Sequence, residues 1–339
     1  GHFPYTVVPT RRLYRFPEYF SEARRLAAAV TGDLVIAVKA FASTVPVAWW
    51  LRRTRGCRMG VYLDEWDGAL MAQRTPRERV RRWTANFHHP MDDVYCPWVE
   101  RLIPGADLVL STSSALQRRF GGEVLSVGVD TQFFAPQPPD QTAAIRAQLG
   151  LTDCRVVVFG GVVRPHKGVE LILQALAERA DPRLRLLVVG PDNEHVQALR
   201  ADPRYQPYLV CTGAQRKADM PRYLDAGDAI ALPLERTPLA ETQTPCKVFE
   251  AMAMAKPIIS TTVADLPAIL EGCGRVVPPG DRSALAAALG EVLDGEVGRA
   301  LGRQARARCE AHYSSAVTAA RLKALCEQTM ARPAGRRHP

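Results

Sequence analysis

Residues 155–170 (RVVVFGGVVRPHKGVE) pass from an apolar β-branched run through glycines into the start of a helix. Gly160 and Gly161 allow close approach of the backbone, and free N–H groups at the helix start attract anions. Arg164 and Lys167 add two cations over four positions, a combination that suits a diphosphate. The GxxxxGK(S/T) pattern of a Walker loop is missing, and an ordinary connection with solvated cations stays open as the alternative.

Short apolar runs alternate with amphipathic stretches through the rest of this half. Expected strands lie at residues 155–159, 184–189, 208–211, 229–232, 257–260 and 274–277, and expected helices at 169–179, 220–226, 248–255 and 283–293. Strands that are apolar throughout and alternate with helices predict a parallel sheet covered on both faces. A ligand is then expected at the carboxyl ends of the strands.

The first half predicts a second domain of the same kind. Expected strands lie at residues 5–9, 33–40, 58–63, 106–111 and 123–127, and expected helices at 18–30, 46–55 and 74–87. The last helix has Thr75 as its N-cap, Pro76 at its first position and Glu78 three residues after the cap. The proline-rich stretch at residues 135–141 (APQPPDQ) is typical of a connection between two domains.

Composition fits a folded protein with an anionic partner. The 339 residues are 47% hydrophobic and 23% charged, and the formal net charge is +9. The eight cysteines form no CxxC pair, so neither a zinc site nor a disulfide framework is indicated, and a reducing cytoplasm fits best. The positive net charge is the only feature of the sequence that favours binding to nucleic acid. No nucleic-acid recognition motif accompanies it, so no nucleic-acid partner is expected. Lysine is rare, with six residues (Lys39, Lys167, Lys217, Lys247, Lys256 and Lys323) among 44 basic ones.

A second chemical motif lies at residues 244–255 (TPCKVFEAMAMA). We expect a helix capped by Thr244, with Lys247 and Glu250 three residues apart on one face. Glu250 either forms a weak surface ion pair with Lys247 or accepts hydrogen bonds from the ribose of a bound nucleotide.

Together these segments resemble the retaining glycosyltransferases of the GT-B fold, in particular glycosyltransferase family 4. The matching segments are GVVRPHKG (161–168), VVGP (188–191), Gly213, YLDAGDAIALPL (223–234), PCKVFEAMAMAKPIIS (245–260) and GRVVPPGDRSALAAAL (274–289). Three of the six lysines fall on these segments. The resemblance implies an α/β protein with two Rossmann-like domains whose parallel sheets face an interdomain cleft.

The domain organisation that this implies has three parts. Residues 1–138 form the acceptor-side domain, 139–310 the donor-nucleotide domain, and 311–339 a helix that crosses back to the first domain, followed by a basic tail. The first domain resembles the family more loosely, through residues 106–136. The family's first strand and glycine-rich loop have no counterpart, so we expect that roughly 25–30 preceding residues are missing from the sequence.

The resemblance also implies roles for the donor side. Gly161, Arg164, Lys167, Lys247 and Glu250 would bind the donor, with Arg164 and Lys167 on its diphosphate. Glu250 matches the second glutamate of the family's E-x7-E motif, which binds the donor ribose.

Two catalytic positions depart from the family pattern. Thr242 occupies the place of the first glutamate of the motif, and Glu241 lies one place earlier; we favour Glu241. Many members have a histidine after the strand at residues 58–63, where this chain has Asp64, and we expect Asp64 to face the reacting sugar. His88 and His89 are the alternatives for this position.

The implied reaction transfers a sugar from a nucleoside-diphosphate sugar to an acceptor hydroxyl with retention. No cofactor is required, and a divalent metal is allowed but not expected. The alternative is a catalytically degenerate GT-B protein that binds nucleotide sugars or serves as a partner subunit.

Two arginine-rich stretches also carry aromatic residues. Five arginines accompany Trp83 and Phe87 in residues 74–87, and Trp49 and Trp50 precede three arginines in residues 49–55. Helices of this kind favour an anionic membrane surface, which predicts a cytoplasmic protein peripheral to the inner face of the membrane. The alternative is a solvated arginine-rich helix whose tryptophan lies in the core.

Overall fold

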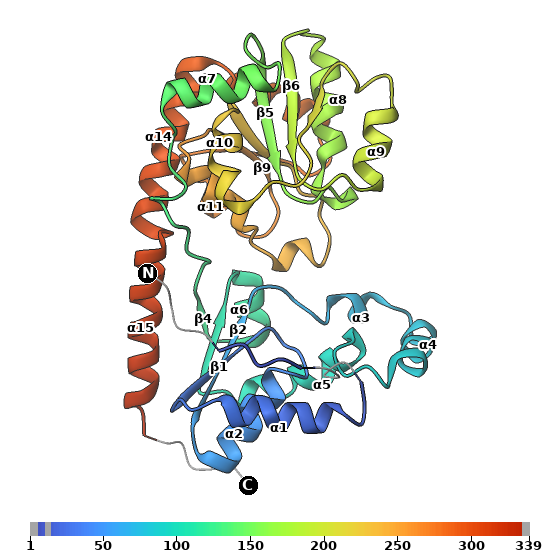
Figure 1. The fold of residues 1–339 in the computed structure, drawn as a ribbon, viewed down its shortest axis with the longest axis vertical. Helices are drawn as coiled ribbons and strands as arrows, with labels where there is room; N and C mark the ends of the chain where they lie inside the picture. The colour runs from blue at the N-terminus through green and yellow to red at the C-terminus, as the bar shows by residue number, and fades with distance from the viewer. Residues whose placement is uncertain (1–5, 11–14, 334–339) are drawn as a thin grey trace. The chain divides into compact units, whose positions relative to one another are not determined.

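The computed structural model describes residues 6–10 and 15–333 and divides the chain into two compact units (Figure 1). Unit 1 comprises Gly1–Ser126 and Ala320–Pro339, and unit 2 comprises Val127–Ala319. The boundary precedes the one expected at residue 138, because Val129 and Phe134 are buried in the core of unit 2. None of the described helices is both long and apolar enough to cross a membrane.

Unit 2 is built on a six-stranded sheet in which all pairings are parallel, in the order β10-β9-β8-β5-β6-β7. The strands are β5 (Arg155–Gly160), β6 (Leu184–Val189), β7 (Leu209–Cys211), β8 (Ala229–Leu232), β9 (Ile258–Thr261) and β10 (Arg275–Val277). Each expected strand of this half is confirmed to within one or two residues at its ends. The strand order reverses between β5 and β8, and such a switch point is where open α/β sheets bind ligands.

Helices cover both faces of this sheet because its strands are apolar on both sides. In β5, Val156 and Val158 pack into one core, while Val157 and Phe159 pack into the other. The first core also contains residues of α7 (Pro139–Gln148), α10 (Met220–Asp225), α11 (Cys246–Ala253), α12 (Leu266–Ile269) and α14 (Gly295–His312). The second contains residues of α8 (Val169–Arg179), α9 (Glu194–Ala201) and α13 (Arg282–Val292). The sheet therefore presents its strand ends, rather than a face, to ligands.

Unit 1 contains a four-stranded parallel sheet in the order β1-β2-β3-β4. The strands are β1 (Leu34–Val38), β2 (Arg58–Leu63), β3 (Leu108–Ser111) and β4 (Glu123–Val124). The strand expected at residues 5–9 is not formed by residues 6–9, and Tyr5 lies outside the described residues. No described strand pairs with residues 6–9, so Val7 and Val8 do not enter the sheet.

Helices of unit 1 pack on both faces of its sheet. The helices of this unit are α1 (Tyr19–Ala29), α2 (Val45–Arg55), α3 (Ala69–Gln73), α4 (Pro76–Asn86), α5 (Cys96–Glu100), α6 (Ser114–Phe120) and the last part of α15 (Ser315–Ala331), with 3-10 turns η1 (Asp93–Tyr95) and η2 (Ile103–Gly105). Residues of α1, α2, α5 and α6 share one core with β2. On the other face, Leu322, Leu325 and Cys326 of α15 pack near Leu108 and Leu110 of β3. Residues 322–326 of α15 therefore contribute to the core of unit 1.

The start of α4 agrees with its sequence signals. Thr75 accepts a hydrogen bond from the backbone N–H of Glu78, and the Glu78 carboxylate accepts one from the backbone N–H of Thr75. The expected capping box is therefore confirmed. The cap expected at Thr244 is wrong: Pro245 is the N-cap of α11, and the buried Thr244 hydroxyl has no hydrogen-bond partner among the described residues.

Candidate functional site

The loop after β5 is held by close backbone contacts with neighbouring strand ends. The backbone N–H of Gly161 donates to the Val189 carbonyl at 2.9 Å, and a Cβ atom on Gly190 would lie 2.0 Å from the Gly161 carbonyl oxygen. Gly168 has a φ of +67°, and a Cβ atom there would lie 2.0 Å from the Pro233 carbonyl oxygen. A side chain at Gly168 or at Gly190 would therefore clash with the backbone. These close backbone contacts fix the path of the loop after β5.

Two expected phosphate-binding cations lie in this loop. Arg164 caps the 3-10 turn η3 (Pro165–Lys167), and α8 begins directly after it at Val169. The Arg164 side chain is exposed and makes no ion pair with the described residues. Burial, followed by the charges of Lys167 and Arg164, lowers the pKa of His166, so its imidazole is neutral near pH 7. The loop therefore concentrates positive charge at the start of α8.

Helix α11 places Glu250 at the same edge of the sheet. Val248 and Met252 are buried, which turns Lys247 and Glu250 away from the core as expected. The Lys247 ammonium lies 3.0 Å from the Glu250 carboxylate, so the ion pair is confirmed. Desolvation raises the pKa of the Cys246 thiol, the charge of Glu250 adds to the rise, and the charges of Lys247 and Lys167 oppose it. Lys167 therefore acts electrostatically on the start of α11.

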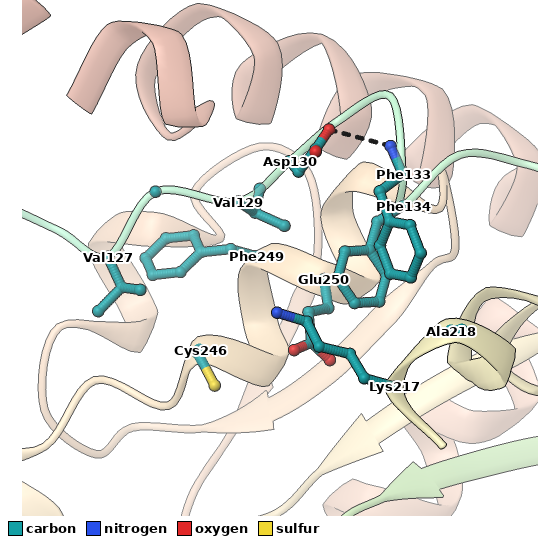
Figure 2. Close-up of a pocket in the computed structure, with 11 residues that line it drawn as sticks. Val127, Val129, Asp130, Phe133, Phe134, Lys217, Ala218, Cys246, Phe249 and Glu250 are labelled. Carbon is teal, nitrogen blue, oxygen red and sulfur yellow. Dashed lines mark hydrogen bonds between the residues drawn. The ribbon is translucent and has the colours of Figure 1, made fainter. Parts of the chain in front are cut away.

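A pocket of about 580 Å³ within unit 2 opens beside Glu250 (Figure 2). Its walls come from residues 127–134, from Lys217 and Ala218 in η4 (Lys217–Asp219), and from α11. Figure 2 shows the side chains of Lys217 and Glu250 directed into the same space. The Asp130 carboxylate instead accepts hydrogen bonds from the backbone N–H groups of Gln132 and Phe133, both at 3.0 Å, and so holds its own turn.

Sequence reasoning assigned no role to two of these pocket residues. Lys217 is exposed and belongs to the six lysines of a chain in which lysine is rare, and this was the signal that could have singled it out. Phe133 lines the pocket from the segment that follows Val127, where the sequence offered no signal.

The candidate catalytic residues Glu241 and Thr242 lie in the loop after β8, within the 3-10 turn η5 (Ala240–Thr242). The Glu241 carboxylate lies 2.9 Å from Arg236 and accepts a hydrogen bond from the backbone N–H of Ala264 at 3.2 Å. Thr242 is buried, and its hydroxyl donates to the Leu239 carbonyl at 2.9 Å. Glu235 joins this loop to the loop after β5 through a backbone bond to the His166 carbonyl. Both candidates are thus on the same edge of the sheet as Arg164. Glu241 connects the loop after β8 to the segment after β9 through its hydrogen bond with Ala264.

Asp64 lies in unit 1, directly after β2, in an acidic cluster around Lys39. The Lys39 ammonium is 2.5 Å from Glu65 and 3.4 Å from Asp64. Burial would lower the pKa of Lys39, but the hydrogen bond and charge of Glu65 and the charges of the other acids raise it. Burial raises the pKa of Asp67 to about 6, against the hydrogen bond that its carboxylate accepts from Ala40. Lys39 therefore neutralises part of the cluster, which sequence alone did not indicate.

His88 and His89, the alternatives to Asp64 for the position of the family's histidine, also lie in unit 1. They follow α4, and their ring centroids are 4.0 Å apart. Among the described residues, no group of three or more His, Cys, Asp or Glu side chains is arranged to hold a metal ion.

Residues 153–295 match the family model described as "Glycosyl transferases group 1". The chain is 30% identical over 247 residues to a GDP-mannose-dependent alpha-(1-6)-phosphatidylinositol monomannoside mannosyltransferase of Mycolicibacterium smegmatis, covering 66% of this chain and 64% of that protein. It is 32% identical over 154 residues to a D-inositol 3-phosphate glycosyltransferase of Segniliparus rotundus, covering 43% of this chain and 32% of that protein. The chain thus spans less than two thirds of the length of these relatives.

Solved structures resemble the chain over most of its length. Sucrose-phosphate synthase from Thermosynechococcus elongatus matches with a TM-score of 0.73 and 22% identity, over 97% of this chain and 82% of that one. HepE from Anabaena, in complex with UDP-glucose, matches with a TM-score of 0.71 and 18% identity, over 92% and 82%. The chain therefore has the GT-B fold, and residues 153–295 are similar to the glycosyl transferases group 1 family, as the signature segments indicated.

Proposed function

We propose that the protein is a retaining glycosyltransferase that moves a sugar from a nucleoside-diphosphate sugar to an acceptor hydroxyl. The observation that carries this proposal is the arrangement of Arg164, Lys167 and Glu250 at the switch point of the six-stranded sheet. Cations for a diphosphate and a carboxylate for a ribose are the groups that a nucleotide sugar needs.

The roles proposed for the donor side follow from what each side chain offers. Arg164 presents an exposed guanidinium fork for two phosphate oxygens, and Lys167 adds a point charge. Gly161 leaves the loop backbone open to the diphosphate, since no atom of the described residues beyond its chain neighbours lies within 4 Å of the position of a Cβ atom there. Lys247 holds the Glu250 carboxylate, which accepts hydrogen bonds from the ribose hydroxyls.

Catalysis would come mainly from stabilising the departing nucleotide. As the bond between the sugar and the diphosphate breaks, negative charge grows on the leaving phosphate, and Arg164, Lys167 and the start of α8 would stabilise it. No covalent enzyme intermediate is required. Glu241 is our first candidate for a group that contacts the donor sugar, with Thr242 and Asp64 as the others. The reaction requires no cofactor, and a divalent metal is allowed but not expected.

The acceptor is proposed to be a hydroxyl of a lipid-linked molecule. Two curated relatives, from Mycolicibacterium smegmatis and Corynebacterium glutamicum, are named for acceptors based on phosphatidylinositol. The arginine-rich helices of unit 1 support an anionic membrane surface as the second partner. A cytoplasmic protein peripheral to the membrane remains our expectation.

The proposal is tested by incubating the protein with GDP-mannose or UDP-glucose and a phosphatidylinositol-containing lipid extract. We expect release of the nucleotide together with a glycosylated lipid whose anomeric proton, followed by NMR, keeps the configuration of the donor. Tight nucleotide binding without transfer or donor hydrolysis would contradict the enzyme and favour a nucleotide-sugar-binding subunit. Loss of binding to every nucleotide would contradict both.

A further inference from the structure

Helix α4 of unit 1 is attached to the rest of the unit through charged side chains. It has no buried residue. Arg82 pairs with Asp92 at 2.7 Å and with Asp93 at 3.2 Å, and Arg74, just before the helix, pairs with Asp93 at 2.6 Å. Phe87, at the end of the helix, accepts a hydrogen bond from the Tyr95 hydroxyl through its carbonyl. The side of α4 that faces the protein is therefore polar.

The opposite side of α4 is apolar and exposed. Val80, Trp83 and Phe87 are 64%, 48% and 51% exposed, and their spacing of three and four residues places them in one stripe. The rings of Trp83 and Phe87 are 5.9 Å apart. A helix that contributes to a protein core has the reverse arrangement, with its apolar stripe inward. The sequence alternative in which Trp83 lies in the core is therefore wrong.

Two arginines flank this stripe. Arg77 and Arg81 are exposed, one turn apart, and no hydrogen bond or ion pair joins their side chains to the described residues. A helical wheel places Arg77 beside Val80 and Phe87, and it places Arg81 on the flank of the helix between the apolar stripe and Arg82. Figure 1 shows α4 at the outer edge of unit 1. The outer side of α4 thus combines an aromatic stripe with free positive charge.

Further aromatic residues, half-buried or exposed, continue from α4 toward α1. Tyr95, which holds Phe87, has its ring 5.8 Å from that of Phe16, and Phe16 has its ring 5.4 Å from that of Phe20. Phe20 and Trp50 line one groove of about 440 Å³ beside α1 and α2, with Arg24 at the same groove. The exposed Phe and Trp side chains among the described residues (Phe20, Trp50, Trp83, Phe87 and Trp98) all lie in unit 1.

We propose that the outer side of α4 docks unit 1 onto an anionic lipid bilayer. Trp83, Phe87 and Val80 would enter the boundary between headgroups and acyl chains, while Arg77 and Arg81 contact lipid phosphates. A second copy of this chain is a poor occupant, because it would bring like charges together across the contact. The docking follows from unit 1 alone; only its purpose, to reach a lipid-linked acceptor, rests on the proposed function.

The proposal is tested by sedimentation of the full chain with vesicles of phosphatidylcholine, with or without phosphatidylglycerol. Wild type should sediment with the anionic vesicles and be released by salt. The double variant Trp83→Ser/Phe87→Ser should bind roughly tenfold more weakly or worse, from the apolar area that it no longer buries. Arg77→Glu/Arg81→Glu should abolish the preference for anionic vesicles.

Arg299→Glu/Arg303→Glu is the matched control, because these exposed arginines have the same spacing on α14 of unit 2. It removes as much charge and should bind like wild type. Equal loss in both arginine variants would show that net charge, rather than α4, attracts the lipid, and would overturn the proposal.

Two other results would overturn the proposal. One is a wild type that does not bind anionic vesicles, and the other is a change of oligomeric state in Trp83→Ser/Phe87→Ser with unaltered vesicle binding. Circular dichroism and nucleotide affinity, which depends on unit 2, should be unchanged in the α4 variants. These controls separate failure of docking from failure of the proposed glycosyltransferase.

Discussion

Phe249 in unit 2 and Trp83 in unit 1 are both aromatic residues on helices, yet their surroundings are opposite. Phe249 is 1% exposed and packs against Tyr313 at 4.7 Å, while Trp83 is 48% exposed on a helix without buried residues. In unit 2 the Phe249 ring belongs to the core, and the exposed Arg164 lies in the loop after β5, at the strand ends. In unit 1 aromatic and basic side chains share the surface. The first arrangement suits a small anionic ligand and the second a lipid surface.

The largest effect is expected from Phe249→Ala. Removing this buried ring should lower the free energy of unfolding of unit 2 by about 3–5 kcal/mol. Urea denaturation followed by circular dichroism measures the change. A loss below about 1 kcal/mol would mean that α11 is not held by this core and would break the contrast with Trp83.

Arg164→Ala should weaken binding of UDP or GDP by about 1.5–3 kcal/mol, because it removes a charge-assisted contact to the diphosphate. Isothermal titration calorimetry measures the affinity. Arg183→Ala is the control, since this exposed arginine precedes β6 at the amino edge of the same sheet. If both variants lose affinity equally, the loop after β5 has no special part in binding.

Glu250→Gln should weaken nucleoside diphosphate binding by about 1–2 kcal/mol, because a ribose loses a charged hydrogen-bond acceptor. Its Tm should stay close to that of wild type, since an ion pair of this kind contributes little to stability. Glu291→Gln breaks the pair with Arg275 at the other edge of the sheet and serves as control. A lower Tm with unchanged affinity would assign Glu250 to the ion pair alone.

Asp67 should make the stability of unit 1 depend on pH. Its pKa is raised from 3.8 to about 6 in the folded chain, so the protonated form is favoured by folding. This stabilisation is complete below about pH 3.8 and is lost as the pH rises through 6. After allowance for partial exposure, Asp67→Asn should gain about 1 kcal/mol relative to wild type between pH 4 and 7. Thermal unfolding of both proteins at several pH values between 4 and 7 measures this gain. A difference in stability between them that stays constant over this pH range would contradict the raised pKa of Asp67.

The smallest effect on stability is expected from Trp83→Ala. Because its side chain is 48% exposed, the free energy of unfolding should change by no more than about 0.5 kcal/mol. The same denaturation experiment as for Phe249→Ala measures it. A loss comparable to that of Phe249→Ala would mean that Trp83 supports the fold of unit 1 rather than an exposed surface.

The strands of unit 2 could be predicted because each is a short run of apolar residues that must be buried on both faces. The helix expected within residues 311–339, which corresponds to α15, rested on the family resemblance alone. Its apolar residues face a core only where Leu322 and Leu325 reach unit 1, and they leave no sustained helical stripe. The cap expected at Thr244 failed because Pro245 takes the extended conformation before the helix.

The candidate site was predictable where one segment carries it. The glycines at 160 and 161 with two cations identify the loop after β5, and the spacing of Lys247 and Glu250 gives their ion pair. Lys217 was missed because it lies far from Glu250 in the sequence. The two residues line the same pocket only because the order of the strands brings separate loops to one edge of the sheet. The pairing of Lys39 with Asp64 was missed for the same reason, since it depends on β1 and β2 ending side by side.

Hydrogen exchange of the intact protein, with and without UDP-glucose or GDP-mannose, tests most directly where the nucleotide sugar binds. Backbone amides of residues 161–169 and 246–250 should exchange more slowly when the ligand is present, while those of residues 76–86 should not change. Protection confined to unit 1, or none in these two segments at saturating ligand, would contradict a donor site at the strand ends of unit 2.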